Sequence, residues 1–218
     1  MIDRRSPRTR LARLVLAVAL LGAVFASTAG SALAQADSLE RVRVKPAGIS
    51  LSVPKAWVQI DPSSPDLAAR VEKVSKKNPE LGAVLEQASL SKVAKLIAID
   101  PGEPGATFRE NVNVLALDEL APAKLSQFED ELRKQFATVP GATVNSVKRV
   151  KLGAQKGFRA DETFPVTNPN GETTNVQVSQ VLLPRGAFRV TIVSVTSLAG
   201  SDTATGDKIL ASIRRLAR

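Results

Sequence analysis

Apolar residues stand at every second position in the segment RVRVKPAGISLSVP, residues 41–54. Val42 and Val44 fall on one side of it, and a break at Pro46 and Gly48 separates them from three further apolar positions, each two residues apart. A period of two is typical of β-strands. The segment therefore predicts two short strands, or one bent strand, which lead through a Val-Pro-Lys-Ala turn to Trp57.

Elsewhere the apolar residues recur at steps of three and four, the spacing of helices that lie on a sheet. The pattern predicts a first helix, a second short helix beginning near residue 81, a third over APAKLSQFEDELRKQFATV and a last one reaching Leu216. The boundary signals are Ser64 and Pro65 at the first start, Asn78 and Pro79 at its interruption, and Asp202 or Thr203 before the last helix. The apolar stripes are Leu67, Val71 and Val74; Leu125, Phe128, Leu132 and Phe136; and Ile209, Leu210, Ile213 and Leu216.

Six further segments predict strands. KLIAID and NVNVLAL come before the third helix, and TVNSVKRVKLG, KGFRADETFPV, TTNVQVSQVLL and AFRVTIVSVTS follow it as a meander. The turns NPNG and PRG separate the later strands. Because strands and helices do not alternate regularly, the order favours an α+β fold: an antiparallel sheet of about six to seven strands, flanked by helices on both faces.

The N-terminal residues have the features of an export signal. Five arginines precede a 12-residue apolar run, LVLAVALLGAVF, and Ala32 and Ala34 fit a cleavage site before Gln35. We therefore expect residues 1–34 to be a signal peptide, 35–41 a flexible leader and 42–218 a single α+β domain, with retention of the segment as an anchor as the alternative. Removing 1–34 lowers the net charge from +9 to +5, because that segment carries five arginines and one aspartate.

The chain has no histidine, cysteine or tyrosine. This excludes a Ser-His-Asp triad, a thiolate nucleophile, a disulfide and a typical zinc site. No cofactor is expected. The remaining catalytic alternative is a secreted hydrolase using a Ser-Lys or a paired-carboxylate site. Ser89 and Lys92 match the S-x-x-K spacing without the other elements of that enzyme class. Asp100 and Glu103 share a Gly/Pro loop that either offers oxygens to a hard cation or is simply solvated, and two carboxylates without a third make a poor cation site.

Two candidate binding positions combine aromatic and polar residues. Trp57 is interpreted either as a core residue or as the wall of a cleft. Glu162 shares one strand face with Phe158 and Phe164, and an unpaired buried carboxylate is costly. Glu162 lies near the exposed end of the strand, pairs with a lysine or arginine of a neighbouring strand, or supplies the polar group of a ligand cavity in which Trp57 could also take part.

A basic cluster is predicted on two adjacent strands and their turn. Lys148, Arg149 and Lys151 lie on the first strand, and Lys156 and Arg159 follow on the second. Such residues either protect a sheet edge from self-pairing or form a patch for anionic lipids or polymers. Nucleic acid is not expected as a partner, because the protein is predicted to be exported and aromatic residues for base stacking are scarce.

The order of elements, together with GISLSVPKAWVQID, VPGATVNSVKRVKLGAQKGFRADETFP, VQVSQVLLPRGAFRVTIVSVTS and DKILASIRR, resembles the PsbP-like α/β/α sandwich. The resemblance covers residues 46 to 216, roughly, and is strongest to the LpqN/LpqT-type secreted proteins of actinobacteria. It implies a non-enzymatic accessory or binding protein of the cell envelope, and it supplies no catalytic motif. The chain departs from that family in lacking the cysteine through which its members are lipid-anchored. We expect a monomer that binds an envelope protein or an anionic envelope lipid or polymer.

Overall fold

The computed structural model describes residues 38–77, 93–102, 108–118, 124–167, 171, 173–186 and 189–217. The predicted signal peptide, the short helix near residue 81, Ser89, Lys92 and Glu103 therefore lie outside the described residues.

The predicted meander forms the larger part of a seven-stranded antiparallel sheet with the order β3-β4-β5-β9-β8-β7-β6. Its members are β3 (Val58–Ile60), β4 (Ala94–Ile99), β5 (Asn111–Leu117), β6 (Thr143–Leu152), β7 (Gln155–Thr167), β8 (Thr173–Pro184) and β9 (Val190–Leu198). The strand count and the antiparallel arrangement confirm the predicted fold class. The short edge strand β3 was not predicted, since three residues give too little alternation to recognise.

The first two strands form a separate small sheet. β1 (Leu39–Val44) and β2 (Ile49–Pro54) pair in antiparallel fashion around a single 3-10 turn, η1 (Lys45–Ala47). Gly48 closes this turn with a φ of 65°, a left-handed conformation that favours glycine. Because β1 begins at Leu39, the last three residues of the segment predicted as a flexible leader are paired strand residues.

The last helix is shorter than predicted. α5 (Ala204–Ala211) ends before Ser212, and Arg214–Arg215 form strand β10, which pairs with β2. The spacing of Ile213 and Leu216 fits a helix, but Ile213 reaches the core equally well from the residue before a strand. Pairing with the open edge of β2 satisfies backbone groups that a continued helix would have left exposed there.

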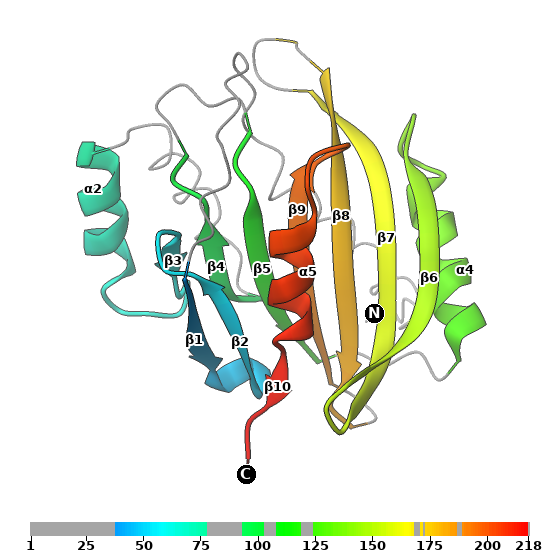
Figure 1. Cartoon of the computed structure of the whole chain (residues 1–218), viewed down its shortest axis with the longest axis horizontal. Helices are drawn as coiled ribbons and strands as arrows, with labels where there is room; N and C mark the ends of the chain where they lie inside the picture. Colours follow the sequence, from blue (N-terminus) through cyan, green and yellow to red (C-terminus); the bar gives the residue numbers. More distant parts are fainter. Residues whose placement is uncertain are drawn as a thin grey trace, which may run out of the picture.

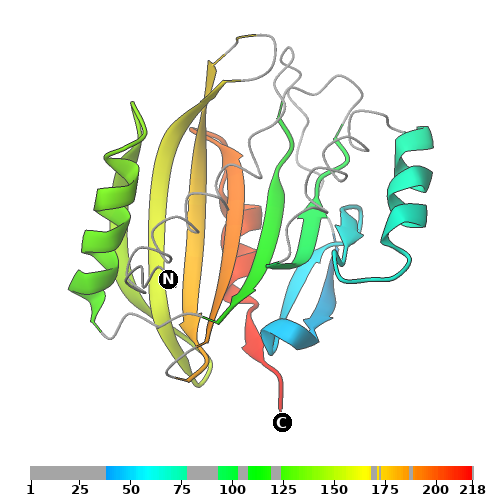
Figure 2. The same cartoon turned by 180° about the vertical axis from the view of Figure 1, so that it is seen from behind.

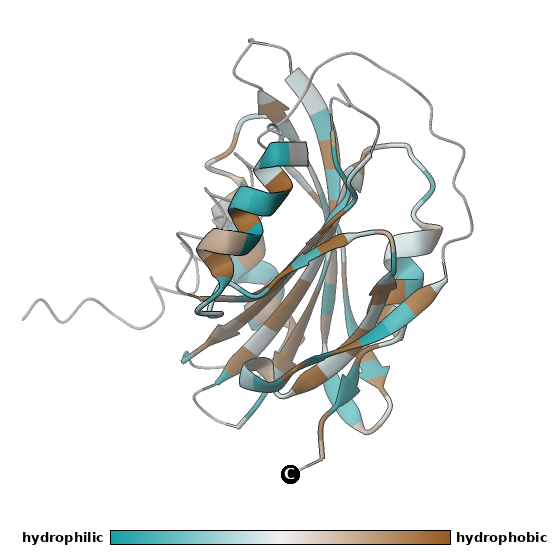
Figure 3. Ribbon diagram, turned by 90° about the vertical axis from the view of Figure 1, so that its left-hand side faces the viewer, coloured by the Kyte–Doolittle hydropathy of each residue, from teal (hydrophilic) through white to brown (hydrophobic). Residues whose placement is uncertain are grey.

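The elements form layers around the seven-stranded sheet (Figures 1 and 2). α2 (Leu67–Lys77) and α4 (Leu125–Phe136) pack against one face, at opposite edges of the sheet, and α5 and the small sheet cover the other face. In Figure 3, apolar and polar positions alternate around α2, as expected for a helix with one buried side.

Two hydrophobic clusters hold the layers together, one on each face. Ile97 and Leu115 belong to the cluster under α2 and α4, whereas Leu96 and Val114, one residue earlier on the same strands, belong to the cluster under α5. The central strands are therefore buried on both sides, which explains why KLIAI and NVLAL read as nearly continuous apolar runs.

Candidate functional site

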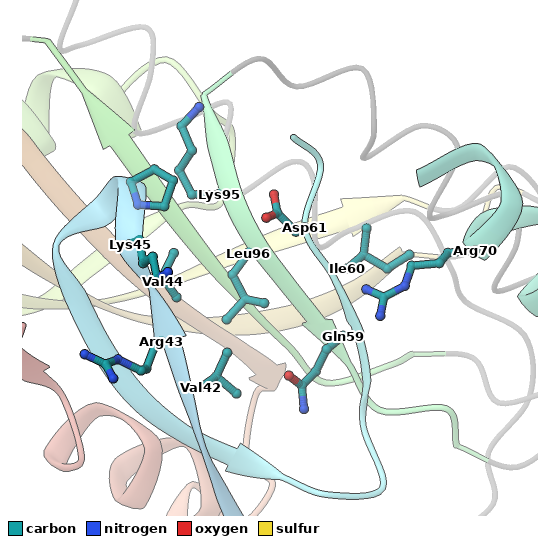
Figure 4. Close-up of a pocket in the computed structure, with 11 residues that line it drawn as sticks. Val42, Arg43, Val44, Lys45, Gln59, Ile60, Asp61, Arg70, Lys95 and Leu96 are labelled. Atoms are coloured by element: carbon teal, nitrogen blue, oxygen red, sulfur yellow. The ribbon is translucent and has the colours of Figure 1, made fainter. Parts of the chain in front are cut away.

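A cleft of about 420 Å³ opens between the small sheet and the β3 edge of the large sheet (Figure 4). Val42, Val44 and Leu96 supply its apolar surface, and α2 contributes Arg70 from the rim. The full lining is Val42, Arg43, Val44, Lys45, Pro46, Gln59, Ile60, Asp61, Arg70, Lys95 and Leu96.

Local pairing keeps this cleft in shape. β1 is held on one side by its antiparallel register with β2, and β3 is held on the other by β4, with Ile60 opposite Ile97. Across the cleft, the Gln59 side-chain amide donates a hydrogen bond to the carboxylate of Glu40. The walls therefore come from two sheets, and a side-chain hydrogen bond joins them.

The charge in the cleft is predominantly positive. Arg43, Lys45, Arg70 and Lys95 are among the lining residues, and Asp61 is the one carboxylate in that lining. The Oδ1 atom of Asp61 already accepts hydrogen bonds from the backbone N–H and the hydroxyl of Ser63, at 2.8 and 2.5 Å. An apolar floor with basic groups around it suits a ligand that presents a phosphate or carboxylate beside an apolar or neutral part.

A second polar feature lies inside the molecule, on the sheet face under α2 and α4. Strand alternation and register bring six buried polar side chains together across four central strands. We call this set the buried polar row; it consists of Asn111, Asn113, Ser194, Thr196, Gln180 and Glu162.

Only part of the buried polar row is satisfied by hydrogen bonds. Asn113 Nδ2 donates to Asn111 Oδ1 at 2.9 Å, and Gln180 Nε2 donates to Glu162 Oε1 at 2.6 Å. Among the described residues, Glu162 Oε2, Ser194 Oγ and Thr196 Oγ1 have no hydrogen-bond partner. Burial raises the pKa of Glu162 to about 8. The hydrogen bond from Gln180 lowers this pKa, and the nearby charge of Asp161 raises it by a smaller amount. Glu162 is therefore a neutral acid at pH 7.

The structure does not bring Trp57 and Glu162 together. Trp57 is 6% exposed in the cluster under α5, whereas Glu162 is 0% exposed on the opposite face of the sheet. Phe158 and Phe164 pack against α4, with ring centroids 5.4 Å from Phe128 and 5.9 Å from Phe136. The shared cavity considered from the sequence is therefore wrong in its geometry, because these residues belong to two separate cores.

The predicted basic cluster divides between the two faces of the sheet. Lys148 is opposite Arg159 in the register, while Arg149 is opposite Phe158 and Lys151 is opposite Lys156. Cross-strand partners share a face, so Lys148 lies on the α5 face and Arg149 and Lys151 lie on the α4 face.

Arg159 is a structural residue rather than part of a basic patch. Its guanidinium contacts Asp161 at 2.9 Å and Asp207 of α5 at 2.8 Å. Hydrogen bonds from Ser146 and Ser179, together with Arg159, hold the pKa of Asp161 below its usual value despite its burial. This network attaches α5 to the sheet.

Three described acidic groups lie near β4, β5 and the start of α5. Glu110 has a pKa raised to about 7, by burial first and then by Asp100 and Asp202. Within the described residues there is no group of three or more side chains that could hold a metal ion. The described helices also include none with the length and apolarity needed to span a bilayer.

Sequence reasoning missed the cleft. Its basic residues are separated by up to 52 positions, from Arg43 to Lys95, and follow no shared spacing. They meet because the small sheet packs beside the edge of the large one, which local periodicity does not reveal.

Comparison with known proteins finds similarity at the level of the fold. No family model matches the chain, and no curated protein matches it significantly. Similar solved structures include cyanobacterial PsbP of Synechocystis (14% identity, TM-score 0.49, covering 87% of this chain and 97% of that one). Another is LpqN of Mycobacterium tuberculosis, described as involved in cell envelope biogenesis (13% identity, TM-score 0.45, covering 75% and 79%). A third is a protein of Bacteroides thetaiotaomicron (13% identity, TM-score 0.44, covering 79% of this chain); the present chain spans about half of its length, 47%.

Proposed function

We propose that this chain is an exported, non-enzymatic accessory or binding protein of the bacterial envelope, and that its cleft takes an anionic group of an envelope polymer or lipid. The observation that carries the proposal is that the cleft lining combines an apolar floor with Arg43, Arg70 and Lys95 and includes one acidic residue, Asp61. A bound phosphate or carboxylate could form charge-assisted hydrogen bonds with these cations.

The buried polar row is a weaker candidate for contact with a partner. Glu162 is fully buried, so a ligand could reach its carboxyl only if the sheet and its covering layer separated. The row also contains no nucleophile with an adjacent base, the arrangement that a hydrolase needs. These facts favour the cleft over the buried polar row as the site of contact.

Titration with a fluorescent glycerol-phosphate oligomer tests the cleft. Arg43→Glu combined with Arg70→Glu is expected to weaken binding by at least about tenfold, since each replacement removes a charge-assisted contact and adds a like charge. The matched control, Lys73→Glu with Lys76→Glu on the exposed side of α2, makes the same change in net charge outside the cleft lining. Equal affinity for the cleft variant and the native protein would refute this assignment.

A screen for turnover addresses the hydrolase alternative. Ester, peptide and glycoside substrates should remain uncleaved by the purified protein. Turnover that is abolished by Ser89→Ala or Glu162→Gln would replace the binding function with a catalytic one.

A further inference from the structure

Several turns of the molecule meet at one end of the large sheet, at the bottom of Figure 1. They are η1, the β6–β7 turn, the β8–β9 hairpin and the segment that contains β10. We call this region the basic end; its cationic side chains are Lys45, which also lines the cleft, Lys151, Lys156, Arg185, Arg189, Arg214 and Arg215.

Specific contacts join these turns. Arg185 Nη1 donates a hydrogen bond to the Pro46 carbonyl at 2.6 Å, and Arg215 pairs with Ile49 in the small sheet. A Cβ added to Gly153 in the β6–β7 turn would lie 3.9 Å from Cδ of Arg214. The turns therefore form one continuous surface although they come from four separate parts of the chain.

The positive charge at the basic end is poorly compensated. The described parts of those segments contain no acidic side chain, and the carboxylate that contacts them is Asp118 at the end of β5, whose Oδ1 lies 3.4 Å from Arg189 Nε. Lys151 stands directly opposite Lys156 in the strand register, and like charges in that relation repel. Burial lowers the pKa of Arg185, and the neighbouring Arg189 and Arg215 lower it further.

Three carboxylates lie at the other end of the same sheet. Asp100 and Glu110 lie where β4 ends and β5 begins, and Asp202 precedes α5. Asp100 and Asp202 both raise the pKa of Glu110, which shows that these carboxylates lie within electrostatic range of one another.

We infer that the basic end is a peripheral docking surface for an anionic lipid bilayer. The segments that carry its cations lie at one end of the sheet, so that they can contact a single surface at the same time. Among the described residues, the exposed large hydrophobic side chain is Leu39, 37% exposed on β1, so there is no apolar anchor of the kind that dominates protein interfaces. Attraction to anionic headgroups needs none, because clustered lysines and arginines bind them through charge alone.

Sedimentation with vesicles tests the inference independently of the cleft. The protein should bind vesicles made of equal parts phosphatidylglycerol and phosphatidylcholine and should not bind vesicles of pure phosphatidylcholine. Bound protein should be released at about 0.5 M salt, where charges are strongly screened. Lys151→Glu, Arg189→Glu and Arg215→Glu together should weaken binding by about a hundredfold or more, since each cation near such a surface contributes about fivefold. Arg214 is left intact because its guanidinium also bonds the carbonyls of Ala211 and Ile213.

The control variant carries Lys73→Glu, Lys76→Glu and Lys134→Glu, an equal change in charge on the exposed sides of α2 and α4. This control variant should keep most of the vesicle binding. The cleft variant, Arg43→Glu with Arg70→Glu, should also keep it, although that variant is expected to lose affinity for the soluble glycerol-phosphate oligomer. Equal losses for the control and the basic-end variant, or native protein that ignores anionic vesicles, would overturn the inference. Soluble polyphosphate bound as tightly as vesicles at equal charge concentration would also overturn it, by assigning the surface to polymers.

Discussion

Replacement of Glu162 by glutamine removes one ionisable group from the interior while preserving its shape. The carboxyl is fully buried on β7, and its Oε1 accepts a hydrogen bond of 2.6 Å from Gln180. The amide oxygen of the variant can accept the same bond. The principal change is that the side chain no longer gains or loses a proton.

The effect on stability follows from the two pKa values. Burial raises the pKa of Glu162 from 4.5 to about 8 in the folded protein. Between these values the folded state retains a proton that the unfolded state releases, so the free energy of unfolding falls as pH rises through this window. The contribution is full below pH 4.5 and is lost progressively up to about pH 8. At about 1.4 kcal/mol per pH unit, the native protein loses about 3 kcal/mol through this group by pH 7.

Urea unfolding at several values between pH 4.5 and pH 8 measures this loss. Trp57 is the single tryptophan and is buried, so its fluorescence reports unfolding. Glu162→Gln should show a shallower fall in stability with pH, although not a flat one, because Glu110 has a raised pKa of about 7 and keeps its share. The added amide N–H groups can lower stability by about 1–3 kcal/mol at every pH if they find no acceptor, and the slope is therefore the decisive readout.

Glu72→Gln serves as the matched control. Glu72 lies on the exposed side of α2 in a pair with Lys76, so its replacement should change stability by less than about 1 kcal/mol and leave the pH slope as in the native protein. If Glu162→Gln and the native protein show the same dependence of stability on pH, the conclusion that Glu162 is protonated in the folded protein is wrong.

Two further predictions concern packing and processing. Gly157→Ala should destabilise the fold by about 3 kcal/mol in the same urea assay, because a Cβ on β7 would clash with the backbone oxygen of Leu182; Gly206→Ala, whose Cβ would meet a Val195 methyl group at 2.9 Å, should cost less, and the reverse order would contradict the packing argument. The secreted protein should have an intact mass corresponding to a start near Gln35, whereas a mass that includes residues 1–34 would indicate a retained anchor.

Much of the fold could be predicted from the sequence because burial repeats with a period. The meander from β6 to β9 was recognised from alternation and turn residues, and α4 from its stripe of Leu125, Phe128, Leu132 and Phe136. The same rule predicted that Glu162 would share a face with Phe158 and Phe164. It did not show what lies over that face, and so it could not distinguish a closed core from a ligand cavity.

The errors arise where tertiary contacts decide the outcome. A periodic helix over Ile213 and Leu216 is locally reasonable, but the open edge of β2 pairs with Arg214–Arg215 instead. The basic cluster was predicted from closeness in sequence, yet adjacent strand residues such as Lys148 and Arg149 face opposite sides. Alternation alone could have revealed that division. The cleft could not have been found in this way, because it depends on how the small sheet packs.

Two features of this protein are unfavourable for stability: buried polar groups without partners and like charges placed side by side. They differ in whether a binding partner could compensate for them. The buried polar row keeps Glu162 neutral and leaves polar oxygens of Ser194 and Thr196 without partners among the described residues. The pairing of Lys151 with Lys156 places like charges together on the surface. Departures of this kind concentrate at functional sites. A partner can reach the lysines and neutralise their repulsion without disturbing the core, whereas relief of the polar row would require the layers to separate. Of the two departures, the exposed one is therefore the stronger evidence for a docking surface.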